Sequence, residues 1–230
     1  LATAISQFAS AILCLIHLLR TKEEYRLYIS KIRFDGRVLG EIIRNGVPSG
    51  FQNSVISIAN VFVQTNINAF GKMAMAGCGS YAKIEGFAFL PVTCFTMALT
   101  TFVSQNLGAK QYDRAKKGAR FGILCSVAIA ELIGFVIYVA APTLIAAFNS
   151  DPSVVHYGVM QARTIALFYF LLAFSHCIAA VLRGSGHASI PMAVMLCVWC
   201  LFRVSYITVT VRLIPDIRVI FWAYPLTWSI

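Results

Sequence analysis

Long apolar segments alternate with short polar segments along the whole chain. A helix needs about 20 predominantly apolar residues to cross the hydrocarbon core of a bilayer. Six segments approach or exceed that length, namely 1–19, 38–71, 82–107, 121–148, 160–182 and 189–211. A seventh apolar segment begins at Val219 and stops at Ile230. The pattern predicts an all-α, polytopic transmembrane helix bundle whose last helix is cut short.

The polar segments between these predicted spans differ in their content of cations. Residues 20–37 hold six Lys or Arg, 110–120 hold five, and 183–187 hold one Arg and one His. Of the three intervening segments, the first holds only Lys72, the second holds no Lys or Arg, and the third holds Arg212 and Arg218. Because cytoplasmic loops are enriched in Lys and Arg, we assign the richer set to the cytoplasmic side. Segment 20–37 is also expected to lie at the interface against anionic lipid, which makes membrane lipid a partner.

Composition and charge support the membrane class. The chain of 230 residues is 59% hydrophobic and 12% charged, whereas a soluble domain is about 45–50% apolar and about 25% charged. The net charge of +10 falls between apolar runs and not on one soluble face, so nucleic acid is not an expected partner. The four His residues lie on separate segments without an H-E-x-x-H motif, which argues against an intramembrane enzyme. No cofactor or resident metal is expected.

Segment 38–71 carries a regular row of polar side chains. They follow one another at steps of four, three, four and four, as Asn53, Ser57, Asn60, Gln64 and Asn68. At about 100° per residue they share one stripe of a helix, roughly 80° wide. Because each buried amide must find partners, a lipid-facing helix would not carry such a row. Two compatible hypotheses remain, which are interhelical hydrogen bonding and the wall of a water-filled cavity.

Glu85, Glu131, His176 and Arg203 are the ionisable side chains within the predicted spans that we consider further. Glu85 is near the start of its span, where it is either solvated or handles an ion or substrate. Glu131 is near the middle of its span, where a charge costs roughly 2.5–3.5 kcal/mol, so it should be paired, protonated or facing water. His176 is either a hydrogen-bonded core histidine or a proton carrier. The stem of Arg203 is expected to snorkel toward the membrane surface.

One basic segment contains the most specific motif. Gln105-Asn106-Leu107-Gly108-Ala109 is followed by Tyr112-Asp113-Arg114-Ala115 and Lys117-Gly118, and Gly108 is expected to be the C-cap of the preceding helix. Together these residues resemble the helix-to-loop signature of the multidrug and toxin extrusion (MATE) transporters. Three further matches follow the family order: Ile43-Arg44-Asn45-Gly46-Val47-Pro48, then Lys83-Ile84-Glu85-Gly86-Phe87 to Pro91, and Leu182-Arg183-Gly184-Ser185-Gly186 with Pro191 and Arg203.

The resemblance implies a fragment of a twelve-helix protein. Residues 1–37 would be the last helix of the N-terminal lobe with the cytoplasmic linker, and 38–230 the C-terminal six-helix lobe, cut in its last helix. The chain has no initiator Met and begins inside an apolar run, which fits that expectation. The missing N-terminal lobe is therefore an expected partner.

The resemblance also implies a function. Family members exchange Na⁺ or H⁺ for bulky organic cations by alternating access, and a bacterial inner membrane is the expected location. The substrate and cation path would comprise the polar row with Glu85, Glu131 and His176. Some members use an acid in the first helix for the coupling ion, and that helix lies outside this sequence. The alternatives are a lipid or polysaccharide-precursor exporter of the same superfamily, and a non-transporting membrane scaffold.

Overall fold

The computed structural model describes residues 2–23, 25–29 and 32–230. The chain divides into two compact units, Leu1–Glu41 and Ile42–Ile230. In the first unit, α1 (Ala2–Arg20) is followed by an irregular segment in which the Leu27 N–H donates to the Leu18 carbonyl at 2.9 Å. The Asp35 side chain then accepts hydrogen bonds from the N–H groups of Arg37 and Val38. Asp35 thus acts as the N-terminal cap of α2 (Gly36–Asn68).

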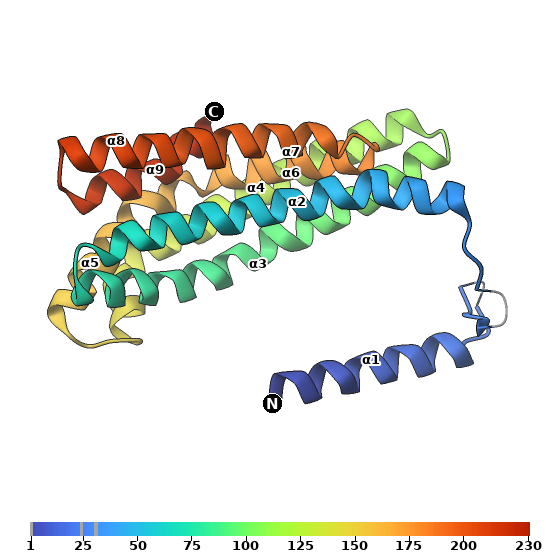
Figure 1. Cartoon of the computed structure of the whole chain (residues 1–230), viewed down its shortest axis with the longest axis horizontal. Coiled ribbons are helices and arrows are strands. Elements are labelled where there is room, and N and C mark those ends of the chain that lie inside the picture. The colour runs from blue at the N-terminus through green and yellow to red at the C-terminus, as the bar shows by residue number, and fades with distance from the viewer. Residues whose placement is uncertain (1, 24, 30–31) are drawn as a thin grey trace. The chain divides into compact units, whose positions relative to one another are not determined.

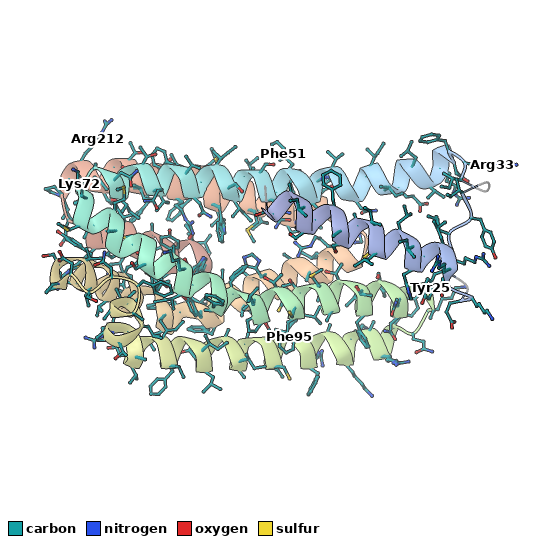
Figure 2. All side chains as sticks on the ribbon, turned by 90° about the horizontal axis from the view of Figure 1, so that it is seen from below. Tyr25, Arg33, Phe51, Lys72, Phe95 and Arg212 are labelled. Atoms are coloured by element: carbon teal, nitrogen blue, oxygen red, sulfur yellow. The ribbon has the colours of Figure 1, made fainter. Side chains whose placement is uncertain are left out.

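The second unit is an antiparallel helix bundle, in which successive long helices are joined alternately at its two ends (Figure 1). After α2 come α3 (Lys72–Gly108), α4 (Tyr112–Ala146), α5 (Pro152–Ile165), the short 3₁₀ helix η2 (Ala166–Phe168), α6 (Tyr169–Gly184), α7 (Ser189–Met195), the π-helical turn η3 (Leu196–Phe202), α8 (Arg203–Leu213) and α9 (Ile217–Ser229). The α3–α4 and α6–α7 turns share one end of the bundle. The α2–α3, α4–α5 and α8–α9 turns share the other, where Lys72 and Arg212 lie (Figures 1 and 2).

Five helical stretches in the described part of the chain are long and apolar enough to cross a bilayer: Thr3–Arg20, Lys72–Gly108, Tyr112–Ala146, Pro152–Gly184 and Ser189–Leu213. α2 is 33 residues long but is not among them, because its row of amides lowers the hydropathy. The predicted span 38–71 is present as the long helix α2, and the all-α membrane bundle is confirmed.

Two predicted connectors are wrong. Residues 72–81 form the first turns of α3, and 112–120 form the first turns of α4. Polar residues mark where a helix leaves the hydrocarbon and not where it ends, because a helix that projects into water keeps its internal hydrogen bonds. Gly108 is also not the left-handed cap residue. It is the last residue of α3, and Lys110 takes the positive φ of 59° instead.

Small residues bring the helices of the bundle close together. A Cβ on Gly77 of α3 would lie 2.5 Å from the Val154 carbonyl oxygen of α5. A Cβ on Gly184 of α6 would lie 2.7 Å from the Thr100 carbonyl oxygen of α3. The Thr100 hydroxyl in turn donates to the Ala180 carbonyl at 3.2 Å. α3 is therefore held against α5 near one end and against α6 near the other, which fixes the position of the side chains between them.

Candidate functional site: a polar cavity beside α2

A cavity of about 530 Å³ lies within the second unit. Its walls come from α2, α3, α6, η3 and α9, and are formed by Asn53, Ile56, Ser57, Asn60, Val63, Gln64, Ala82, Glu85, Gly86, Phe89, Leu172, His176, Trp199, Tyr224 and Trp228. Asn53, Ser57 and Asn60 are exposed, so the cavity opens to the surface of the unit. The volume suits a molecule of several fused or linked rings, within the range of about 300–1,000 Å³ that is usual for ligand pockets.

The polar row of α2 forms one wall of this cavity. Asn53, Ser57, Asn60 and Gln64 line it, whereas Asn68 does not. Asn68 lies one turn beyond the lining residues, and its side-chain oxygen accepts a hydrogen bond of 2.9 Å from the Gln64 Nε2. This bond orients the Gln64 amide at the edge of the cavity. The row therefore presents neutral donors and acceptors to whatever enters.

A neighbouring amide that the sequence reasoning missed ties α2 to another helix. Gln52 is buried, and its Oε1 accepts a hydrogen bond of 3.3 Å from the Arg183 Nη1 of α6. At the opposite end of α2, Val63 and Ile67 pack in a cluster with Cys78, Ile207 and Phe221, among others. α2 is thus anchored directly before the polar row, at Gln52, and within its last part, at Val63 and Ile67. Gln52 directly precedes Asn53 but lies on a different face of α2. An amide off the face of the polar row was the feature that could have pointed to this second contact.

Glu85 is the acidic side chain in the lining of the cavity. It is half-buried on α3 and interacts electrostatically with Tyr81 of its own helix, Tyr169 of α6, Tyr224 of α9 and Arg203 of α8. Tyr81 and Tyr169 are buried and share a hydrogen bond of 2.8 Å between their hydroxyl oxygens. Glu85 therefore lies in the cavity lining, where three phenols and a guanidinium influence its charge.

His176 and Glu131 are placed differently. His176 lines the cavity and packs edge-on against Phe89 and Trp199, with ring centroids 5.2 and 6.1 Å away. Among the described residues its Nε2 has no hydrogen-bond partner, so the hypothesis of a hydrogen-bonded core histidine does not hold for that nitrogen. Glu131 of α4 is not in the cavity wall. Its Oε2 is buried and has no hydrogen-bond partner among the described residues.

An aromatic wall stands opposite α2, and the sequence reasoning missed it. Trp199 of η3 with Tyr224 and Trp228 of α9 line the cavity. Behind the rings of Trp199 and Tyr224 lies the guanidinium of Arg203, whose Cζ is 4.3 and 4.7 Å from their centroids. Arg203 is fully buried, so the expectation that it snorkels is wrong. The four-residue spacing between Trp199 and Arg203 was the signal in the sequence, since it stacks them on one helix face.

The residues of the basic motif lie outside the cavity wall. Gln105, Asn106 and Gly108 end α3, and Asp113 with Arg114 begin α4. The Asn106 carbonyl accepts from the Gln111 N–H at 2.8 Å, which closes the turn. Asp113 lies in the first turn of α4, where a negative charge stabilises a helix. Arg183 and Gly184 end α6 at the same end of the bundle (Figure 1). The motif thus builds the turns of that end.

The described residues contain no group of three or more His, Cys, Asp or Glu side chains that could hold a metal ion. The oxygen atoms that meet at the cavity are the Glu85 carboxylate and the side chains of the α2 row. Hard cations such as Na⁺ are bound by oxygen ligands, and a proton needs only the carboxylate. The cavity wall therefore offers one anionic site, neutral amides and the aromatic side chains of Phe89, Trp199, Tyr224 and Trp228.

Comparisons with known proteins agree on one family. The sequence model of the family described as MatE matches residues 48–208. The chain is 27% identical over 193 residues to "Probable multidrug resistance protein NorM" of Thermotoga maritima, covering 84% of this chain and 41% of that protein. It is 24% identical over 198 residues to "Probable multidrug resistance protein YoeA" of Bacillus subtilis, covering 84% and 42%.

The fold is likewise similar to solved structures. The "Crystal structure of MATE in complex with MaL6" superposes with a TM-score of 0.90 at 18% identity, covering 99% of this chain and 52% of that chain. This chain thus spans about half the length of the proteins that it matches.

Proposed function

Since the chain belongs to the MatE family, we propose that it forms one half of a multi-pass exporter, which exchanges Na⁺ or H⁺ for organic cations. The cavity beside α2 carries this proposal. It combines one carboxylate with neutral amides and aromatic rings, and aromatic faces together with a carboxylate attract delocalised cations. The names of the NorM and YoeA relatives, which describe multidrug resistance, favour the same cargo class.

We further propose that this half is the C-terminal lobe. Residues 1–37 would then be the last helix of the first lobe with the linker, and 38–230 would be the second lobe. The missing first lobe would close the open side of the cavity, where the α2 row is exposed. Rocking of two such lobes around a central site is the general logic of transporters built from repeats. The bacterial inner membrane is the location that suits the bacterial relatives.

Within this mechanism Glu85 is the group that binds the coupling cation in this half. It is the acidic side chain of the cavity lining, and a cation on Glu85 cancels the charge that attracts the cargo. His176 and the α2 row contact the cargo from the neighbouring walls. Glu131 is excluded from this role because it is not in the cavity wall.

The test is efflux of ethidium by the full-length protein in proteoliposomes under an imposed Na⁺ or H⁺ gradient. We expect gradient-dependent efflux from the natural protein and its loss in the double variant Asn60→Leu/Gln64→Leu. The matched control is Val61→Leu/Thr65→Leu, which alters two exposed positions of the same helix outside the cavity wall. Efflux should persist in this control.

Two results would count against the proposal. Unchanged efflux from the folded Asn60→Leu/Gln64→Leu variant would separate the α2 row from the transport path. No efflux of ethidium under either gradient, from folded natural protein, would favour a lipid or polysaccharide-precursor exporter. If the folded protein transports none of these cargoes, the remaining alternative is a non-transporting membrane scaffold.

A further inference from the structure

Arg203 is a buried cation beside the cavity but outside its wall. It begins α8 directly after the π-helical turn η3, and its exposed fraction is 0%. Its Nη2 donates a hydrogen bond of 2.5 Å to the Thr227 Oγ1 of α9, and Thr227 itself donates to the Ala223 carbonyl. Within the described part of the chain, its Nε and Nη1 atoms have no hydrogen-bond partner. A guanidinium does not deprotonate in proteins, so this position keeps a full positive charge.

A buried charge with a single hydrogen bond is costly unless other groups compensate it. Two rings do so directly, because the Cζ of Arg203 lies 4.3 Å from the Trp199 centroid and 4.7 Å from the Tyr224 centroid. Trp199 and Tyr224 also line the cavity. The remaining compensation is electrostatic attraction to Glu85. Glu85 and Arg203 therefore carry opposite charges that attract each other, with Glu85 in the cavity lining and Arg203 outside it.

The other groups that face Glu85 do not carry a positive charge. Tyr81 and Tyr169 share their hydroxyl hydrogen bond, Tyr224 stacks on Arg203, and His176 lies in the aromatic wall of the cavity. From α2 the cavity receives only hydroxyl and amide side chains in its polar lining. Arg203 is thus the fully buried cation next to the aromatic wall, and Glu85 is its anionic counterpart. Arg183 is a second cation, which hydrogen-bonds Gln52 at the end of α6 and interacts electrostatically with His176.

We propose that Arg203 determines exchange specificity: its fixed charge behind the aromatic wall makes the organic-cation cargo and the coupling cation mutually exclusive in the cavity. This inference rests on the proposed function and deepens it.

With Glu85 ionised, the pair is neutral overall, and one monovalent cation can enter. With one cation bound, whether cargo or coupling ion, the cavity carries one net positive charge. A second cation would then meet the uncompensated charge of Arg203 across a poorly hydrated wall.

Without Arg203, a second cation would no longer be repelled from the cavity. The cavity would be anionic when empty and neutral with one cation bound, so cargo would bind more tightly and a second cation would be tolerated. The variant should therefore bind cargo better and exchange it worse. A role of Arg203 in holding the fold alone would predict weaker binding or no change.

The experiment measures ethidium binding to the purified full-length protein by fluorescence. Titrations are made with and without saturating coupling cation, at constant ionic strength. In the natural protein, we expect the coupling cation to weaken ethidium binding by tenfold or more. In Arg203→Met, we expect ethidium to bind about tenfold more tightly without coupling cation, because one nearby positive charge is lost in a medium of effective dielectric constant about 20. The competition should largely disappear.

Three companion variants make the test specific. Arg203→Lys keeps the charge and should restore the competition. Arg203→Gln removes the charge but can still donate to Thr227, so it serves where Arg203→Met does not fold. Arg163→Met is the matched control, because it removes an Arg that lies 5.8 Å from the Tyr138 ring, away from this cavity. It should change neither the affinity nor the competition.

Several outcomes would overturn the inference. Unaltered affinity and competition in Arg203→Met or Arg203→Gln would do so while leaving the proposed function intact. If both neutral variants misfold and Arg203→Lys folds, the charge of Arg203 is needed for folding and not for exchange. Failure of the natural protein to bind ethidium would refute the proposed function and the inference together.

Discussion

The hydrogen bond between the hydroxyls of Tyr81 and Tyr169 provides a sharp test of the structure around Glu85. The two oxygens are 2.8 Å apart, and the exposed fractions of the side chains are 0% and 4%. Because water cannot replace a lost partner, Tyr81→Phe leaves the Tyr169 hydroxyl unsatisfied, and Tyr169→Phe does the reverse. The double variant Tyr81→Phe/Tyr169→Phe removes both hydroxyls and leaves no orphan.

The magnitudes follow from the cost of an unsatisfied buried group. Each single variant should lose about 1–2 kcal/mol of the free energy of unfolding, since side-chain hydrogen bonds in membrane bundles are worth about 0.6 kcal/mol on average and up to about 1.7. The double variant should lose no more than about one single variant. The coupling free energy of the pair is then about 1 kcal/mol. At roughly 2–4 °C per kcal/mol, the single variants should melt about 2–8 °C lower.

Thermal unfolding of the full-length protein, followed by tryptophan fluorescence, measures these differences. Tyr112→Phe is the control, because Tyr112 is exposed at the start of α4 and its melting temperature should not change. Additive losses in the double variant would refute the reasoning, since they would mean that the two hydroxyls do not depend on each other.

Further predictions concern the helix ends and contacts, each measured by the same unfolding assay. Gly184→Val should lower the melting temperature by several degrees because its Cβ would lie 2.7 Å from the Thr100 carbonyl oxygen, whereas Gly108→Ala meets nothing within 4 Å and should be nearly neutral. Lys110→Gly should stabilise by about 1 kcal/mol because it relieves the positive φ of 59°; destabilisation would contradict that turn. Asp151→Ala should cost about 0.5–2 kcal/mol because the carboxylate accepts from the N–H groups of Ser153 and Val154 at the start of α5, and Asp151→Asn should recover most of this loss.

The sequence was sufficient to predict the bundle, the family and the face of α2 that meets the cavity. Periodicity predicted the face of α2, because polar side chains spaced by four, three, four and four residues all lie on one helix face. Glu85 and His176 were named with the row, and the structure places both in the same wall. Glu131 was named on equal grounds, yet it is not in that wall. Position in the span did not predict which acid lines the cavity, because a charge near the middle of a span is as strong a functional signal as one near its start.

Features that depend on how distant helices cross could not be predicted. Trp199, Tyr224 and Trp228 come from η3 and α9, and their rings meet because the π-helical turn shifts the register of the chain before Arg203. A π-turn leaves little trace in composition. The prediction that Arg203 snorkels failed for the same reason. The sequence does not show which helices pack against each other, so it could not show that Thr227 and the aromatic rings contact Arg203. The helix ends near Lys72 and Tyr112 were missed because charge marks the membrane boundary and not the last hydrogen bond.

The polarity of α2 connects the fold to the proposed exchange. Its residues Ile58 and Val61 are exposed on an apolar face, whereas Asn53 and Asn60 are exposed toward the cavity. A lone helix of this kind would be a poor membrane span, and α2 indeed lacks the hydropathy of the five candidates. Its position therefore depends on its anchors, the Gln52–Arg183 hydrogen bond and the packing of Val63 and Ile67. Between those anchors one face of the helix buries Val55 and Ala59 against the bundle, while the polar row on another face lines the cavity opposite the aromatic rings.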